Sequence, residues 1–288
     1  MTGTDPGFRP LLAIYSHPDD ETFSSAGVMA EAAARGVPVT VICLTRGEAG
    51  DSGIPGLDQP EVLGAVRERE LREAMAAIGV RDVRFMAYRD SGMPGSPHAA
   101  DPRALVNADP DVAADQLVVA IRDIGPGAVL TFGADGIYGH DDHLAAHRIV
   151  SEAVSRAGRL GYRPELGEPV PAPALYYAAA PRDELLSMFA RRDKPGNGMP
   201  EERHALMGTP REEITHWLDV GMWRSQKLAA IVAHRTQTGD GGPISGMADQ
   251  DLQRRLSRET FVRAAAGFAA AADVVAALAD ERPWSENT

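Results

Sequence analysis

Residues 11–21 read LLAIYSHPDDE, in which an apolar run leads directly into a polar turn with one histidine and three acidic residues. Over residues 23–35 the apolar residues then recur at helical spacing. A short apolar run predicts a buried strand, and the spacing that follows predicts a helix. The stretch therefore predicts the first strand and the first helix of a parallel sheet.

The same alternation continues through the first half of the chain. The predicted strands are residues 11–15, 37–44, 83–87 and 128–132, and the predicted helices are residues 23–35, 61–78, 112–124 and 140–157. Alternation of this kind is typical of a mostly parallel sheet covered by helices on both faces. We therefore expect an α/β fold with three layers.

The second half of the chain shows weaker periodicity. The expected elements are strands over 174–179 and 214–220, helices over 183–191, 222–233 and 261–279, and loops over 192–203 and 239–246. We see no internal repeat and no low-complexity tract. The sequence therefore predicts one domain over residues 1–288, in which a catalytic sheet core (10–160) is followed by specificity and packing elements (161–288).

The composition narrows the class of protein. In 288 residues, 29 Lys and Arg stand against 41 Asp and Glu, and the net charge of −12 argues against a nucleic-acid partner. A single cysteine, Cys43, excludes a disulfide framework and a multi-cysteine metal site. The first ten residues lack the apolar stretch of a signal peptide, and residues 264–279 are too short and polar to cross a membrane. We expect a cytoplasmic protein without membrane partners, whose oligomeric state the sequence leaves open.

The turn after the first predicted strand carries His17, Asp19 and Asp20. Open parallel sheets bind ligands beyond the carboxyl ends of their strands, which is where these side chains fall. Pro18 stiffens the turn, so that a metal ligand and a base can be presented together. The alternative is a polar turn in which an aspartate caps the following helix. A dinucleotide site would need G-x-G-x-x-G here, and that pattern is absent.

A second cluster, Tyr138-Gly139-His140-Asp141-Asp142-His143, follows the strand predicted over 128–132. On a helix, His140, His143 and His147 fall on one face. A lone histidine is usually structural, but three beside two aspartates favour a metal or acid–base site. We expect His147, which lies one turn further along the helix, to support the site or belong to the core.

Both clusters are expected at the same edge of the sheet. His17, Asp20 and His143 together give two imidazoles and one carboxylate, which is the ligand set of a catalytic zinc site with one open position. Fe²⁺ or Mn²⁺ accepts the same donors. Asp19 is then free to act as a base, and His140 is free to donate a proton or stabilise an oxyanion.

Residues 17–21 (HPDDE) together with 139–143 (GHDDH) resemble the LmbE/PIG-L family of metal-dependent de-N-acetylases. The resemblance covers roughly residues 10–240. It is supported by TRGE at 45–48, Arg67 and Glu70, DSGM at 90–93, and AHRTQ at 233–237. It implies a Rossmann-like α/β fold and hydrolysis of the N-acetyl group of a small amino-sugar substrate.

The resemblance also implies roles for residues at matching positions. Asp19 is expected to activate water, His140 to stabilise the tetrahedral intermediate and protonate the leaving amine, and Tyr138 to contact the oxyanion. The implied zinc ligands are His17, Asp20 and His143. The implied substrate contacts are Arg67, Asp90 and His234, although His234 is equally explained as a helix-end residue. The DSGM pattern matches members of the mycothiol pathway and favours an inositol-linked sugar.

Two residues depart from the family pattern. Ser16 replaces the usual alanine, and Asp141 replaces the usual proline after His140. We expect the extra charge of Asp141 to raise the pKa of His140. Two other functions remain open: an amidase that cleaves thiol conjugates, and a non-catalytic module that binds a sugar or nucleotide. A serine hydrolase is disfavoured because no G-x-S-x-G motif is present.

Overall fold

A computed structural model of the chain describes residues 7–191, 205–239, 244–264 and 273–284. Its strands form a single sheet in the order β3-β2-β1-β4-β5-β7-β6. The strands are β1 (Leu11–Tyr15), β2 (Val39–Cys43), β3 (Asp82–Phe85), β4 (Ala128–Phe132), β5 (Ala174–Ala178), β6 (His216–Asp219) and β7 (Arg258–Arg263). Strands β1 to β5 pair in parallel, whereas β7 is antiparallel to both β5 and β6.

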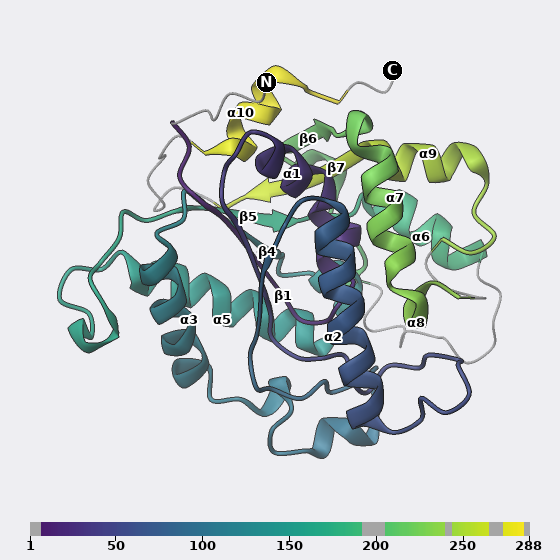
Figure 1. The fold of residues 1–288 in the computed structure, drawn as a ribbon, viewed down its shortest axis with the longest axis horizontal. Coiled ribbons are helices and arrows are strands. Elements are labelled where there is room, and N and C mark those ends of the chain that lie inside the picture. Colours follow the sequence, from purple (N-terminus) through teal and green to yellow (C-terminus); the bar gives the residue numbers. More distant parts are fainter. Residues whose placement is uncertain (1–6, 192–204, 240–243, 265–272, 285–288) are drawn as a thin grey trace.

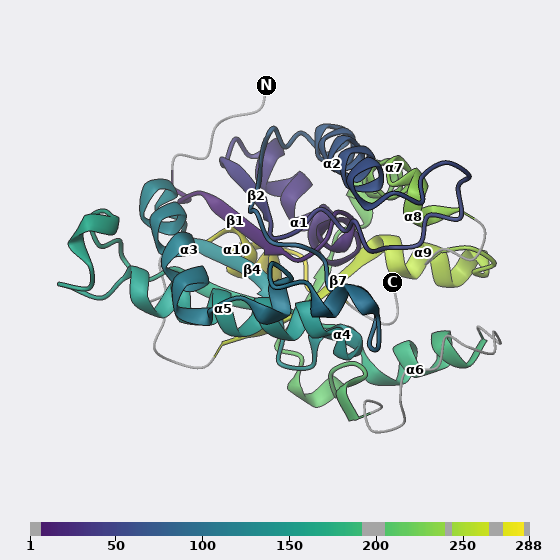
Figure 2. The same cartoon turned by 90° about the horizontal axis from the view of Figure 1, so that it is seen from below.

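Helices cover both faces of this sheet (Figures 1 and 2). On one face α1 and α2 pack with α7, and on the other α3 packs against α5, which lies over β1 and β4. The helices are α1 (Asp20–Ala34), α2 (Pro60–Ala77), α3 (Pro110–Ile124), α4 (Gly136–Gly139), α5 (Asp141–Ala157), α6 (Arg182–Arg191), α7 (Arg224–Ala233), α8 (Arg235–Thr238), α9 (Asp249–Ser257) and α10 (Val274–Glu281). Within the described ranges, none of these helices has the length and apolar character needed to cross a membrane.

The central strands form the core. Every residue of β1, β2 and β4 is buried, and these strands are rich in Leu, Ile and Val. Strands that helices cover on both faces need continuous apolar sequence instead of alternation. The rings of Tyr15 and Phe132 meet edge to face, 5.1 Å apart, at the carboxyl ends of β1 and β4. The α/β fold expected from the sequence is therefore confirmed.

One predicted element is wrong. Residues 261–279 were expected to form a helix, but residues 258–263 form the strand β7, and the described helix there begins at Val274. The segment RETFVR carries aromatic and β-branched residues, and it pairs with strands on both sides, which outweighs the helical signal of the alanine-rich sequence after it. The loop predicted over 192–203 lies outside the described residues, as does the part of loop 239–246 from 240 to 243.

Candidate active site

Both predicted clusters lie at the carboxyl ends of β1 and β4. His17 comes two residues after β1, and His140 is the N-cap residue just before α5. The helices that follow these two strands cover opposite faces of the sheet. Adjacent parallel strands with this property mark the ligand site of open α/β sheets. The sequence clusters, far apart along the chain, therefore meet at the position expected for a ligand.

Three side chains bring their metal-binding atoms together there. His17 Nδ1 lies 3.3 Å from Asp20 Oδ2, and His143 Nε2 lies 3.3 Å from Asp20 Oδ1. The two imidazole nitrogens, His143 Nε2 and His17 Nδ1, are also 3.3 Å apart. This trio is one of the groups of described residues able to hold a metal ion.

The remaining ring nitrogens of these histidines have other partners. His143 Nδ1 donates to the carbonyl oxygen of Gly136 at 3.0 Å. His17 Nε2 faces two carboxylates, Asp142 Oδ2 at 3.2 Å and Asp90 Oδ1 at 3.4 Å. Hydrogen bonds of this kind fix the tautomer of metal-binding histidines. Each imidazole therefore directs a lone pair toward the other and toward Asp20.

This donor set fits a divalent cation. Two lone pairs and a carboxylate that face one another repel unless a cation lies between them. Tetrahedral zinc with bonds of about 2.0–2.1 Å places its ligand atoms about 3.3–3.4 Å apart, close to the separations observed. A second group of described residues that could hold a metal is His17, His140 and Asp142. In this group the Asp142 amide donates to His140 Nδ1 at 3.1 Å, and the Asp142 carboxylate is hydrogen-bonded to His17 Nε2. These atoms therefore already have hydrogen-bond partners.

The charges around His17 and Asp20 match this arrangement. Burial lowers the pKa of His17, but the carboxylates of Asp90, Asp142 and Asp20 outweigh it and hold that pKa well above its usual range. Burial likewise raises the pKa of Asp20, and the neighbouring His143 and His17 reverse the effect and hold it well below the usual range. The site thus stabilises positive charge beside a carboxylate.

Asp19 points its carboxylate to the edge of this cluster. Its side chain is 17% exposed, and its Oδ1 lies 3.5 Å from a guanidinium nitrogen of Arg67. Burial raises the pKa of Asp19 to about 6, against the opposing effect of Arg67. A cation bound to the adjacent Asp20 would lower that pKa again. Asp19 is therefore an accessible carboxylate beside the candidate metal site.

His140 has one ring nitrogen available. The Asp142 amide donates to its Nδ1, so the neutral ring carries its proton on Nε2. Burial, followed by the neighbouring His143 and His17, holds the pKa of His140 well below its usual range. The expectation that Asp141 raises this pKa is therefore wrong, because burial dominates. His140 is a neutral hydrogen-bond donor in this environment.

Tyr138 lies on a strained turn beside the histidines. Its ring centroid is 5.2 Å from that of His143, and burial raises the pKa of its hydroxyl. The preceding Ile137 has φ 65°, a conformation that a β-branched residue rarely adopts. Asp135 stabilises this turn by accepting the Ile137 amide at 2.9 Å and the Thr209 hydroxyl at 2.6 Å. Tyr138 therefore keeps its hydroxyl proton and can donate it in a hydrogen bond.

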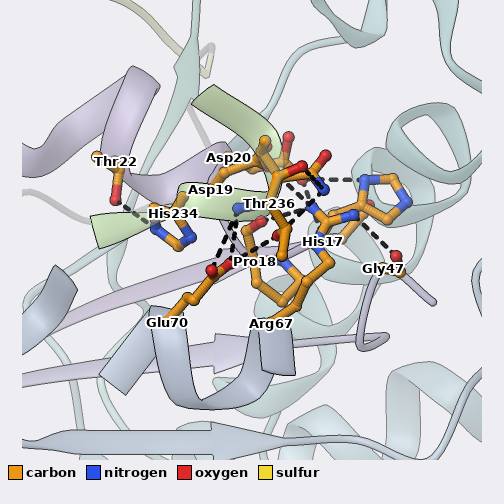
Figure 3. A network of polar contacts seen from close by, with 12 residues as sticks. His17, Pro18, Asp19, Asp20, Thr22, Gly47, Arg67, Glu70, His234 and Thr236 are labelled. Carbon is orange, nitrogen blue, oxygen red and sulfur yellow. Dashed lines mark hydrogen bonds and ion pairs between the residues drawn. The ribbon is translucent and has the colours of Figure 1, made fainter. Parts of the chain in front are cut away.

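The three residues predicted to contact substrate are all buried. Arg67 is 3% exposed, and it donates to the carbonyl oxygens of Gly47 at 2.8 Å and Pro18 at 2.6 Å. Asp90 accepts the amides of Ala49 and Gly92 in addition to facing His17. His234 has no exposed surface and lies against α1 (Figure 3). Their contact with a substrate stays a prediction.

Sequence reasoning did not assign a function to Asp142. Its side chain has no exposed surface, and its Oδ2 accepts the Ser91 amide at 2.9 Å as well as facing His17. Its carbonyl oxygen accepts the hydroxyl of Ser16 at 3.0 Å. Ser16, one of the two departures from the family pattern, thus links the two loops of the site. The one signal in the sequence that could have pointed to Asp142 is its place in the second motif, residues 139–143.

Two weaker candidates lie outside the cluster. His147 Nδ1 donates to the carbonyl oxygen of Phe132 at 3.0 Å, and its ring packs against Tyr177. Glu48 accepts the Arg46 amide at 3.1 Å and pairs with Arg89 at 3.3 Å. Both residues stabilise the structure around the site.

Comparison with known proteins gives a consistent result. The family described as GlcNAc-PI de-N-acetylase (PIG-L) matches residues 12–154. A 1D-myo-inositol 2-acetamido-2-deoxy-alpha-D-glucopyranoside deacetylase of Acidothermus cellulolyticus is 36% identical over 268 residues, which cover 88% of each chain. Both described clusters, at 16–20 and 138–143, lie within the matched region.

Solved structures share the fold at low sequence identity. The N,N'-diacetylchitobiose deacetylase of Pyrococcus horikoshii aligns with a TM-score of 0.64 and 19% identity, over 89% of this chain and 84% of that one. The 4-carboxy-2-hydroxymuconate hydratase of Pseudomonas putida aligns with a TM-score of 0.57 and 21% identity, over 86% of this chain and 82% of that one. One fold therefore carries different reactions, and function has to be argued from the site.

Proposed function

Because the chain belongs to the PIG-L family, we propose that it is a metal-dependent hydrolase that removes the N-acetyl group from a small N-acetylglucosamine-type conjugate. The observation that carries this proposal is the trio His17, Asp20 and His143, whose donor atoms lie 3.3 Å from one another. An accessible carboxylate, Asp19, lies beside them. Amide hydrolysis needs both parts, since the carbonyl is a weak electrophile and the amine a poor leaving group.

We assign the metal as Zn²⁺, held by these three residues. Two imidazoles and one carboxylate are a catalytic zinc set, although Fe²⁺ and Mn²⁺ accept the same donors. When bound, the ion supplies polarisation of a carbonyl and a lowered pKa of water. Asp142, Asp90 and the Gly136 carbonyl orient the two histidines for this role.

The proton transfers fall to side chains of the chain itself. Asp19 accepts a proton from the attacking water, and Arg67 holds its carboxylate in place. His140 donates its Nε2–H to the developing oxyanion, because its other nitrogen is occupied by the Asp142 amide. Tyr138 donates its hydroxyl to the same oxyanion. The proton that reaches the leaving amine comes from Asp19, which has taken it from the attacking water, because a neutral His140 has no acidic proton to transfer.

The substrate class that fits best is an inositol-linked N-acetylglucosamine. The relative from Acidothermus cellulolyticus is named for such a conjugate. A cavity of about 90 Å³ opens beside the loop after β2, and its lining includes the carboxylates of Glu48, Asp51 and Asp58. Carboxylates accept hydrogen bonds from sugar hydroxyls. The neighbouring Ala49 donates to Asp90, which connects this cavity with the candidate metal site.

The test is acetate release by the zinc-loaded protein. We expect turnover of the inositol-linked N-acetylglucosamine above that of free N-acetylglucosamine, and loss of turnover after chelation. A mycothiol S-conjugate assayed in parallel separates the amidase alternative, which requires space for a larger acyl group. Tight sugar binding without metal-dependent turnover would instead identify a non-catalytic binding module and contradict the proposal.

A further inference from the structure

The backbone of Asp19 has an unusual conformation. Its φ is 125° and its ψ is −30°, although it is not a glycine. Conformations of this kind cost about 1–3 kcal/mol and persist only where the surroundings enforce them. Asp19 is also the N-cap residue of α1, yet its side chain makes no capping hydrogen bond. The surrounding structure therefore turns this carboxylate away from the helix it would ordinarily cap.

Two buried charged side chains hold the peptide group that joins Pro18 to Asp19. Its carbonyl oxygen accepts a guanidinium N–H of Arg67 at 2.6 Å. Its N–H donates to Glu21 Oε2 at 3.1 Å. Fixing both ends of a peptide group fixes the plane of that group, and with it the φ angle of the following residue. The conformation of Asp19 is thus set by Arg67 on one side and Glu21 on the other.

Glu21 is in turn held by His234. The Glu21 side chain is 1% exposed, and its Oε1 accepts the Thr22 hydroxyl. His234 Nε2 lies 3.3 Å from the same oxygen and 3.2 Å from the Thr22 hydroxyl oxygen, and its Nδ1 has no hydrogen-bond partner among the described residues. Because the Thr22 hydroxyl donates its own proton to Glu21, Nε2 faces two acceptor oxygens and donates an N–H toward them. Both polar contacts of this buried ring are with the first turn of α1, and they orient it.

His234 is the C-cap residue of α7, and its side chain lies beside Thr22 of α1 (Figure 3). Helix α7 packs on α1 and α2, so its end lies over the first turn of α1. Two residues later Thr236 donates its amide and hydroxyl to Glu70 of α2, at 3.1 and 2.6 Å. Glu70 lies on the same helix as Arg67. The segment from His234 at the end of α7 to Thr236 in α8 therefore contacts both helices that hold the peptide before Asp19.

From these contacts we infer that Glu21 and His234 are positioning residues: they hold the Pro18–Asp19 peptide so that the Asp19 carboxylate lies against Arg67 beside the metal site and does not cap α1. This inference rests on the proposed function for its consequence, since Asp19 is the proposed base. In this inference His234 orients Glu21 instead of contacting the substrate directly, which was the role expected from the sequence. Without the pair, Arg67 holds only the carbonyl end of the peptide, and the N–H end loses its acceptor.

The first test is the steady-state kinetics of the zinc-loaded His234→Leu variant. Leucine keeps most of the volume but removes the N–H that Glu21 accepts. We expect kcat to fall about 10- to 100-fold, as for other residues that orient an active-site group, with KM changed less than about threefold and zinc content unchanged. His234→Gln, whose amide can still donate, should recover much of the lost kcat. A folded His234→Leu variant with the kcat of the wild type would overturn the inference.

A matched control comes from the same helix. Lys227 of α7 pairs with Glu259 at 2.6 Å, and Glu259 accepts the amides of Gly27 and Val28 in α1. This pair joins α7 to α1 as His234 does, and it is equally buried. The double variant Lys227→Met/Glu259→Gln should lower Tm and leave kcat unchanged. An equal loss of kcat in this control would show that His234 acts only through general stability, which would also overturn the inference.

A measurement independent of turnover is the amide resonance of Asp19 in the zinc-loaded protein. An N–H that donates to a buried carboxylate exchanges slowly with solvent. We expect His234→Leu and Glu21→Gln to shift this resonance and speed its exchange, whereas the control double variant does neither. An unmoved resonance would contradict the inference. A moved resonance in a protein that releases no acetate would retain the positioning role and reject the proposed function.

Discussion

At the scale of single residues, the site separates metal binding from proton transfer within one short turn. His17 and Asp20 direct their donor atoms toward His143, whereas Asp19 between them points toward Arg67. Adjacent residues can diverge in this way only because the backbone at Asp19 has a positive φ. Within this turn, the strained residue is the one whose direction matters for the proposed chemistry.

Removing the proposed base should abolish turnover without removing the metal. We expect Asp19→Ala and Asp19→Asn to lower kcat by about 10²- to 10⁴-fold, because neither side chain accepts a proton. Zinc content should stay at the value of the wild type, since Asp19 is not one of the three ligands. The check is acetate release alongside metal analysis of the same samples. Normal turnover by Asp19→Ala would refute the assignment of the base.

The metal ligands are tested by stoichiometry. We expect about one Zn²⁺ per chain in the wild type and a weakened affinity in His17→Ala, Asp20→Ala and His143→Ala, because each change removes one of three protein ligands. His147→Ala is the control, since its ring bonds the Phe132 carbonyl outside the trio. Unchanged zinc content in all four variants would disprove the joined site.

At the scale of elements, the loop after β2 packs closely around the guanidinium of Arg67, which comes from α2. A Cβ atom on Gly47 would lie 2.4 Å from the guanidinium carbon of Arg67, and Gly47 has φ 63°. A side chain there is therefore excluded both by the backbone conformation and by the guanidinium. This explains why a glycine follows Thr45 and Arg46 in the sequence. Arg67, positioned by this loop, then donates to the Pro18 carbonyl and pairs with the Asp19 carboxylate.

Replacing this glycine should reduce both stability and activity. Gly53 is the matched control, because its φ is 58° and no atom lies within 4 Å of the position of its Cβ. Gly53→Ala should lower the free energy of unfolding by about 1–2 kcal/mol, the cost of a left-handed backbone. Gly47→Ala should cost more and lower kcat as well, because it displaces Arg67. Denaturant unfolding and acetate release measure the two effects, and equal behaviour of the variants would contradict this role of Gly47.

At the scale of the whole molecule, the later part of the chain completes the sheet and holds α1. Strands β7 and β6 extend the sheet beyond β5 in antiparallel pairing. Glu31 of α1 accepts the Trp223 indole N–H at 2.6 Å and a guanidinium N–H of Arg282 at 2.9 Å. Helix α1, whose first turn carries the site, is therefore anchored at its other end by residues far away in the sequence.

The hydrogen bonds of Glu31 make the free energy of unfolding depend on pH. Burial raises the pKa of Glu31, but hydrogen bonds from Trp223 and Arg35 outweigh it and leave that pKa lowered in the folded protein. A lowered folded pKa contributes stability above the unfolded value of about 4.3, and this contribution is lost as pH falls through the folded pKa. Glu31→Gln should therefore lower Tm at pH 7, and its difference from the wild type should shrink below about pH 4. Exposed Glu168→Gln is the control, and a constant difference for Glu31→Gln would contradict the prediction.

The first half of the fold was predictable because its signals are local. Strands β1 and β4 have the predicted bounds, and the other early strands and helices differ from prediction only at their ends. Family membership and the α/β fold are confirmed. Strand β7 was missed because its pairing with β5 and β6 is not visible in one segment. The domain limits and the roles of the site residues stay predictions.

The sequence by itself determined the class of sheet, the two motifs at its edge and the residue types able to bind a metal, since each depends on local pattern. Only the tertiary structure decided which atoms meet. It paired His17 with Asp142, turned the unused nitrogens of His17 and His143 toward Asp20, and buried Arg67 and His234 behind Asp19. The reason is that these contacts join segments separated by 49 to 213 residues, and only the stacking of strands and helices brings such segments together.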